Sequence, residues 1–202
     1  MRPRRRLLKN DLVADVTQRR SKGVVELWAM DEHRVGLKPI LRRVWARRGK
    51  RPQAVVRPRY EWLYVYAFVC PETGETEFWL VPSANTESFQ RVLAAFLRGR
   101  SASVLLVLDQ AGWHIANDIK AMERDQELAL KYLPSHSPEL QPAERLWTLV
   151  DEPLVNEVFE SLAQLEAALA ERCVALTNEP DRIRGLTLYH WWPGGADHPV
   201  SV

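Results

Sequence analysis

Three acidic residues stand at positions from which carboxylates could act together: Asp31, Asp109 and Glu144. Asp31 follows the apolar run VVELWAM and Asp109 follows VLLVL, so each is expected at the end of a buried strand. A charge at such a place is unfavourable unless it is paired or bound to a metal ion. Glu144 begins a long apolar-periodic stretch, where the positive end of a helix dipole favours an ionised carboxylate.

Carboxylate oxygens are the ligands that Mg²⁺ prefers. Two such ions roughly 3.5–4 Å apart would activate a nucleophile and stabilise the leaving oxygen of an in-line phosphoryl transfer. Taken singly, each acid has an ordinary explanation, because strand-end acids form turns and caps and first-turn acids are common. Taken together, they predict a metal-dependent phosphoryl-transfer site. The chain has no Gly-rich P-loop, no GxSxG elbow and no HExxH pair, so those alternatives are less favoured.

Five apolar runs predict the strands that would position these acids, over residues 24–30, 60–70, 75–83, 103–110 and 128–134. Helical spacing predicts helices over 86–100 with Thr86 as N-cap, around 116–125, and from Ala143 to about Leu176 with a bend or break at Pro153. The order predicts an α/β fold with a mixed five-stranded sheet flanked by helices. Ligands of such sheets bind at the carboxyl ends of parallel strands, where Asp31 and Asp109 are expected.

Charge is distributed unevenly along the 202 residues, although the net charge is only +2. Residues 1–59 hold 18 Lys and Arg against 5 Asp and Glu, and the remainder holds 10 against 21. Such asymmetry predicts a polyanionic partner, most simply DNA, with a solvated basic surface as the alternative. No apolar run is long enough to span a bilayer, and Cys70 and Cys173 are isolated, which excludes a membrane partner and favours a reducing cytoplasm and association with the nucleoid.

Basic residues concentrate in RRVWARRGKRP (42–52), which predicts a DNA-facing hairpin with a stacking aromatic side chain. The candidate DNA-binding residues are Arg42, Arg43, Trp45, Arg47, Arg48, Lys50 and Arg51. The alternative is a solvated hairpin with Trp45 packed inward. Residues 1–23 suit a basic N-terminal arm or linker ahead of a catalytic domain over 24–202. Nothing before residue 24 has room for a helix-turn-helix module, so we expect DNA binding mainly through charge, with little sequence choice.

Several motifs, in this order, resemble the catalytic domain of IS630-type transposases, members of the IS630/Tc1/mariner superfamily. They are MDEHRVGL (30–37), RRVWARRGKRP (42–52), LVLDQAGWH (106–114), LPSHSPELQPAERLW (133–147) and VFESLAQLEAAL (158–169). The 34 residues between Asp109 and Glu144 match the interval of one group in that superfamily. Many relatives carry Asn where this chain has Gln110, and Asn-Pro-Ile-Glu where it has Gln141-Pro142-Ala143-Glu144, so hydrogen bonding around the carboxylates is expected to differ.

The resemblance implies an RNase H-like fold and a catalytic triad that binds Mg²⁺, with Mn²⁺ as a substitute. Asp31, rather than Glu32, would be the first metal ligand, Asp109 the second and Glu144 the third. It further implies DNA cleavage at transposon ends and strand transfer into target DNA, by a homodimer or higher synaptic multimer. His114 closes the second motif and would touch substrate, orient a carboxylate or serve the fold, and Trp147 is expected in the core. The alternatives are another RNase H-like nuclease and a non-catalytic or decayed DNA-binding remnant.

Overall fold

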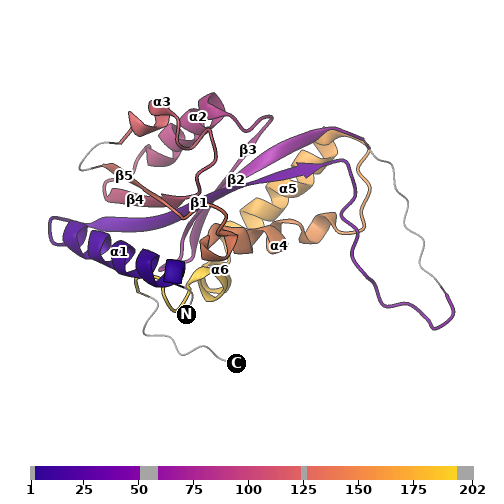
Figure 1. The fold of residues 1–202 in the computed structure, drawn as a ribbon. Helices are drawn as coiled ribbons and strands as arrows, with labels where there is room; N and C mark the ends of the chain where they lie inside the picture. Colours follow the sequence, from indigo (N-terminus) through magenta and orange to yellow (C-terminus); the bar gives the residue numbers. More distant parts are fainter. Residues whose placement is uncertain (1–2, 51–58, 124–126, 195–202) are drawn as a thin grey trace.

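The computed structural model describes residues 3–50, 59–123 and 127–194, with side chains from Asn10 onward (Figure 1). The strands are β1 (Val25–Gly36), β2 (Trp62–Cys70), β3 (Glu75–Val81), β4 (Ser103–Leu108) and β5 (Leu128–Tyr132). The α-helices are α1 (Pro3–Arg20), α2 (Thr86–Leu97), α3 (Asn117–Lys120), α4 (Trp147–Val150), α5 (Leu162–Thr177) and α6 (Pro180–Thr187). Short 3₁₀ helices cover Pro138–Leu140, Ala143–Leu146 and Glu152–Leu154.

The five strands form one mixed sheet in the order β3-β2-β1-β4-β5. β1, β2 and β3 are antiparallel neighbours, whereas β4 and β5 run parallel to β1. The pairing of β1 with β4 ends at Ala29↔Val107, but its pairing with β2 continues to Gly36↔Trp62. Beyond Ala29, β1 is therefore the edge of a three-stranded antiparallel part of the sheet, because β2 also pairs with β3 as far as Tyr64↔Val81, and only Val35 and Gly36 extend past β3. The expected mixed sheet is confirmed (Figure 1).

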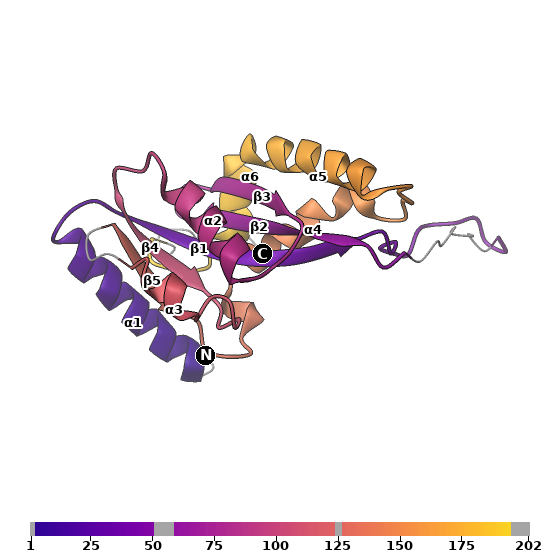
Figure 2. The same cartoon turned by 90° about the horizontal axis from the view of Figure 1, so that it is seen from above.

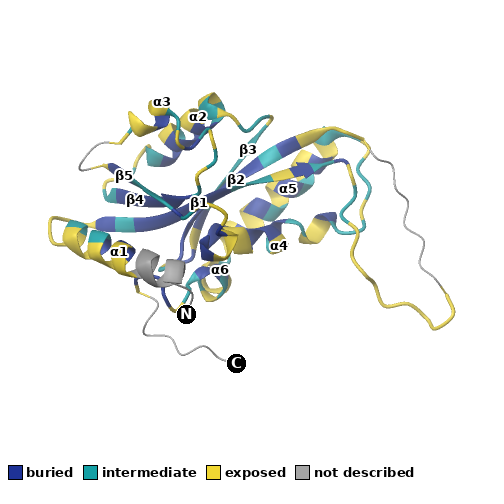
Figure 3. Ribbon diagram, viewed as in Figure 1, coloured by how far each residue is buried: buried dark blue, intermediate teal, exposed yellow. Residues whose placement is uncertain are grey.

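Strand residues alternate between two hydrophobic cores, as side chains of period two must. Leu27 and Ala29 of β1 pack on the face covered by α1, α4, α5 and α6, while Trp28 and Met30 pack on the face covered by α2 and α3. Figure 1 shows α2 and α3 on one side of the sheet and the other helices on the opposite side, Figure 2 shows from above that α1 and α5 lie near opposite edges of the sheet, and Figure 3 shows its strands largely buried. Asp31 continues the first set and Glu32 the second, so the two neighbouring acids face opposite sides.

Two expectations about element boundaries are wrong. Asp31 lies inside β1 rather than at its end, because the strand continues to pair with β2 after its pairing with β4 has stopped. The N-cap of α2 is Asn85, whose side chain accepts a hydrogen bond from the backbone N–H of Ser88 (2.8 Å), rather than Thr86.

The helical stretch after Ala143 is interrupted over a longer span than one bend would give. The 3₁₀ helix Glu152–Leu154 contains Pro153, and the chain then runs without helix until α5 begins at Leu162. Asn156 has a positive φ of 63°, and its side chain accepts a hydrogen bond from the N–H of Arg42 (3.0 Å). The non-helical segment between Leu154 and Leu162 therefore holds the first residue of the basic segment 42–52 in place.

The N-terminal segment that the sequence predicts as an arm or linker contains helix α1. Leu12 and Val16 of α1 are buried in the core, and Asp15 pairs with Lys131 of β5 at 2.6 Å. Apolar residues too sparse to predict a helix are enough here, because the sheet supplies the surface on which they pack. The domain boundary at residue 23 stays a prediction. Among the described helices, none is both long and apolar enough to cross a membrane.

We predict that Gly74→Ala lowers the free energy of unfolding by about 3 kcal/mol or more, because two penalties add. Gly74 ends the turn between β2 and β3 with φ +80°, and a Cβ there would lie 1.9 Å from the carbonyl oxygen of Pro180. Gly99→Ala is the matched control, since Gly99 has φ +81° with no atom near its Cβ position, and should cost only about 1–2 kcal/mol. Urea denaturation of both variants measures the difference, and equal losses would contradict the close approach.

Candidate active site

A cavity of about 250 Å³ opens at the carboxyl end of β4 and contains all three predicted acids. Its walls come from β1, from the residues after β4 and from the proline-rich segment before α4. They are Asp31, Asp109, Gln110, Ala111, Leu133, Pro134, Ser135, His136, Ser137, Pro138, Gln141 and Glu144. Asp31, Asp109 and Glu144, which are far apart in the sequence, therefore face one space.

Asp31 is the most buried of the three acids. Its Oδ2 accepts a hydrogen bond from the indole Nε1 of Trp147 at 2.9 Å. Burial raises the pKa of the Asp31 carboxyl well above its usual range, the carboxyls of Glu144 and Glu32 raise it further, and the Trp147 indole opposes them. A nearby positive charge would remove this penalty, because it would favour the ionised form.

Asp109 follows β4 directly and is half exposed, as expected for a strand-end acid. Its Oδ1 accepts hydrogen bonds from Nδ1 of His114 (2.6 Å) and from the backbone N–H of Ala111 (3.0 Å). Burial alone would raise the pKa of Asp109, but these two donors outweigh it and lower the pKa below its usual value. Asp109 is thus held ionised and oriented at the cavity.

His114 is fully buried and lies between two carboxylates. Its Nε2 is 3.2 Å from Oε2 of Glu32, an ion-pair distance at an angle outside hydrogen-bond geometry. Burial alone would lower the pKa of His114, but Asp109 and Glu32 overcome it and raise the pKa to about 9. Of the three roles considered for His114, the contacts are those of a residue that orients a carboxylate. Glu32 does not line the cavity, because it faces the other side of the sheet.

Glu144 lies in the 3₁₀ helix Ala143–Leu146 and is exposed at the cavity. The segment before it is anchored by Gln141, whose buried Nε2 donates to the carbonyl oxygen of Met30 (2.8 Å). The pairing of β1 with β4 ends at Ala29, so the carbonyl of Met30 has no partner on β4. The side-chain amide of Gln141 supplies the hydrogen bond instead. His136 in the same segment has a positive φ of 53°, a conformation in which a non-glycine residue is uncommon.

The donor set of the cavity is suited to a hard divalent cation, since it offers carboxylate oxygens from Asp31, Asp109 and Glu144. Across the residues that the structure describes, no three His, Cys, Asp or Glu side chains already enclose a metal position. The pKa of Asp31 is raised first by burial and then by the neighbouring carboxyls of Glu144 and Glu32, and a bound cation would oppose both effects because it favours the ionised form.

The candidate DNA-binding residues lie on a segment that follows β1 and projects away from the sheet (Figures 1 and 3). Arg42, Arg43, Trp45, Arg47, Arg48 and Lys50 are all exposed, and Arg51 lies outside the described residues. The inward packing of Trp45 is thereby excluded, because its side chain is fully exposed. A turn at residues 47–50 is present, closed by a hydrogen bond from Lys50 N–H to Arg47 O (2.9 Å), but no strand flanks it within the described part.

Three residues near the carboxylates have contacts that sequence reasoning did not assign. Trp147 is in the core as expected, but its indole also reaches Asp31. Gln141 reaches Met30, and the side chain of Gln110 donates to Leu133 O (2.8 Å). A signal for Trp147 was present, since residues three apart on a helix share a face and Trp147 is three residues after Glu144.

Comparisons with known proteins place the chain in a family. Residues 26–166 match the DDE superfamily endonucleases. A curated protein of Sinorhizobium fredii (strain NBRC 101917 / NGR234), "Uncharacterized protein y4pE/y4sA", is 33% identical over 135 residues, which cover 64% of this chain and 96% of that protein.

Solved structures of Mos1 mariner transposase share the fold. The pre-cleavage Mos1 transpososome aligns with a TM-score of 0.63 at 15% identity, covering 97% of this chain and 63% of the Mos1 chain. The Mos1 catalytic domain alone aligns with a TM-score of 0.52 at 15% identity, covering 93% of both chains. This chain therefore spans less than two thirds of the Mos1 chain in the transpososome. The mixed sheet flanked by helices is an RNase H-like fold, as expected. The chain belongs to the DDE superfamily endonucleases.

We predict that the charged imidazole of His114 makes the stability of the protein depend on pH. Because its folded-state pKa of about 9 lies above the usual 6.5, the stabilisation is complete below pH 6.5 and is lost as the pH rises through 9. The loss is at most about 3 kcal/mol. Chemical denaturation in EDTA at pH 7 and pH 10 should show a larger loss for wild type than for His114→Gln. Equal losses in the two proteins would contradict a charged His114.

Proposed function

We propose that this chain is the catalytic domain of an IS630-type transposase that cleaves and joins DNA with Mg²⁺. The observation that supports it most is the convergence of Asp31, Asp109 and Glu144 on one cavity, inside the region that matches the DDE endonucleases. The 34-residue interval between the second and third acids agrees with the superfamily resemblance. The substrate is a phosphodiester at a transposon end and then one in target DNA.

Each reaction step is an in-line displacement at phosphorus. In the first, a water oxygen forms a bond to phosphorus while the bond to the 3′ oxygen breaks, which leaves a 3′-hydroxyl and a 5′-phosphate. In the second, that 3′-hydroxyl attacks a target phosphodiester and displaces the target's own 3′ oxygen. The same bonds change in both steps, so one set of carboxylates can serve both.

The residues of the chain contribute positioning and charge. Asp31, Asp109 and Glu144 would hold divalent cations, which when bound activate the nucleophile and stabilise the leaving oxygen. His114 holds Asp109 in one orientation and keeps it ionised. Mg²⁺ is the proposed ion and Mn²⁺ the substitute, and Mos1 structures with each of these metals carry the same fold.

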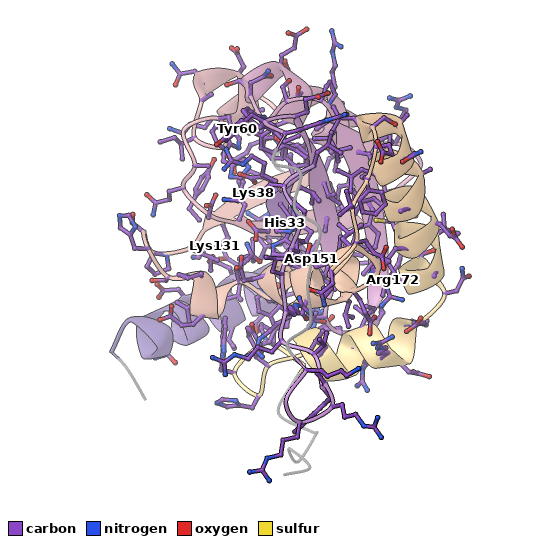
Figure 4. The ribbon with its side chains drawn as sticks, turned by 90° about the vertical axis from the view of Figure 1, so that its right-hand side faces the viewer. His33, Lys38, Tyr60, Lys131, Asp151 and Arg172 are labelled. Atoms are coloured by element: carbon purple, nitrogen blue, oxygen red, sulfur yellow. The ribbon has the colours of Figure 1, made fainter. Side chains whose placement is uncertain are left out.

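The DNA-binding surface that we propose includes the extension at Arg42–Lys50 and a second cavity at its base. This cavity, about 410 Å³, is lined by cationic side chains, including Arg34 and Lys38, and by the aromatic rings of Tyr60 and Trp62. The guanidinium of Arg34 lies 5.3 Å from the centroid of the Trp62 ring. Figure 4 shows Lys38 and Tyr60 on the same side of the molecule as His33. Cations that track phosphates and exposed aromatic rings that stack on bases suit DNA.

We further propose that the chain acts as a homodimer or higher synaptic multimer on the nucleoid. The fold is shared with Mos1 transposase in paired-end complexes, which hold transposon DNA. Residues 60–202 carry a net negative charge and would be repelled by DNA, so contact would fall to the basic residues among 1–59.

We predict that Asp109→Asn abolishes metal-dependent cleavage, because the amide cannot serve as an anionic ligand. The assay uses duplex DNA from the ends of the element that encodes the chain, with Mg²⁺ or Mn²⁺. Asp118→Asn, at an exposed acid of α3, is the control and should cut like wild type. Equal residual cutting by wild type and Asp109→Asn would refute catalysis and favour a DNA-binding remnant. Cutting of RNA–DNA hybrid but not of duplex DNA would favour another RNase H-like nuclease.

We predict that changing Arg42, Arg43, Arg47 and Arg48 to Gln makes DNA binding weaker and less dependent on salt. Each lost phosphate contact should reduce the slope of log affinity against log salt concentration by about 0.9. Fluorescence anisotropy with a duplex between 50 and 300 mM salt measures this slope. Arg91→Gln with Arg98→Gln is the control, because Arg91 is an exposed arginine of α2 and Arg98 is the exposed residue at its C-cap. A slope that falls by the same amount per changed arginine in both variants would show general attraction rather than a defined DNA-binding segment.

A further inference from the structure

The indole of Trp147 has a second function besides packing in the core. It is buried, and its Nε1 donates to Oδ2 of Asp31 at 2.9 Å. A donor placed on one oxygen of a carboxylate restricts rotation of that carboxylate and therefore fixes the direction of its remaining lone pairs. The two hydrogen-bond partners of the Asp31 side chain act in opposite directions, because the Glu144 carboxyl raises the pKa of Asp31 and the Trp147 indole lowers it. The indole is therefore the partner that favours the ionised carboxylate.

The indole ring of Trp147 is held in place by residues of both β1 and the C-terminal end of α4. The imidazole of His33, also on β1, stacks on it with centroids 5.0 Å apart and an interplanar angle of 18°. Nε2 of His33 lies 3.0 Å from Oδ1 of Asp151, and the backbone N–H of Asp151 donates to the carbonyl of Trp147 (2.9 Å). Figure 4 shows His33 and Asp151 next to one another. The contacts form a closed loop between β1 and α4.

This loop connects the first and third acids of the candidate site. Glu144 and Trp147 lie on consecutive turns, the 3₁₀ helix Ala143–Leu146 and α4, whereas Asp31 and His33 lie on β1. Any shift of α4 along β1 therefore moves Glu144 and changes the hydrogen bond to Asp31 together. The Trp147 side chain thus links the position of Asp31 to that of Glu144.

We propose that Trp147 is a positioning residue for the metal site: its indole N–H orients the Asp31 carboxylate for a divalent cation and ties that orientation to the segment carrying Glu144. The inference rests on the proposed function, because it assigns a role at the same carboxylates. Partners of metal ligands of this kind typically change metal affinity or activity by about 10–100-fold when they are removed.

The test compares Trp147→Phe with Trp79→Phe. Phe keeps an aromatic ring in the core, although a smaller one, and lacks the indole N–H. Trp79 of β3 is a matched control, because its Nε1 also donates to a carboxylate, Oε1 of Glu77 at 2.9 Å, away from the site. Binding of Mn²⁺ without DNA is followed by electron paramagnetic resonance, and cleavage is measured against Mn²⁺ concentration. Trp147→Phe should weaken Mn²⁺ binding about 10–100-fold and recover cleavage at higher Mn²⁺, whereas Trp79→Phe should match wild type.

The outcomes separate this inference from the proposed function. Wild type that binds no Mn²⁺ and cuts no DNA overturns both. Wild type that binds and cuts, together with a Trp147→Phe protein of unchanged Mn²⁺ affinity, overturns the role of Trp147 alone. If Trp147→Phe does not fold, NMR signals of the tryptophan indole N–H groups in ¹⁵N-labelled wild type test the inference instead. One of them should shift on Mg²⁺ addition in wild type but not in Asp31→Asn, and no shift in wild type overturns the inference.

Discussion

The gathering of carboxylates at one partly buried edge of the sheet is the constraint on which the surrounding structure depends. Asp31, Asp109 and Glu144 face one cavity, and Glu32 lies just behind it. Like charges in such a place repel one another and lose hydration, so each needs a compensating contact. His114 supplies one to Asp109 and Glu32, and Trp147 supplies one to Asp31. Both compensating rings are buried in the hydrophobic cores, which explains why the site cannot be separated from the fold.

The alternation of β1 distributes these contacts between the two cores. Asp31 and His33 face the layer that contains Trp147, while Glu32 faces the layer that contains His114 and Tyr66. Consecutive residues thereby connect the site to helices on both sides of the sheet. A change in the packing of either layer reaches the same short stretch of strand, and a slip of one residue in the register of β1 would exchange the two acids.

The five strands, their order along the chain and the mixed sheet could be predicted from the sequence, because apolar runs are local signals. The three acids are candidates by their places next to apolar runs and by the family resemblance, and the structure brings them to one cavity. The length of β1 could not, since MDEHRVG carries polar residues that become strand only through pairing with β2. Helix α1 was missed for a similar reason, because Leu12 and Val16 acquire a partner only when the sheet exists. The roles of His114, Gln141 and Trp147 depend on which atoms meet in three dimensions. Their residue types indicated core or polar contacts but did not specify the partners Asp109, Met30 and Asp31.

The continuation of β1 beyond its pairing with β4 connects the site to the basic extension. Asp31 lies on this strand, the chain continues from its last residue, Gly36, to the extension, and a strand rises about 3.3 Å per residue, so Gly36 is about 17 Å from Asp31. Between these two residues β1 pairs with β2, which is backed by β3 as far as Tyr64↔Val81, whereas pairing to β4 ends at Ala29. Asp31 therefore lies on a part of β1 that is no longer paired with β4, the strand that Asp109 follows. A movement of β1 relative to β4 at this point would change the distance between the two acids without breaking a strand pair.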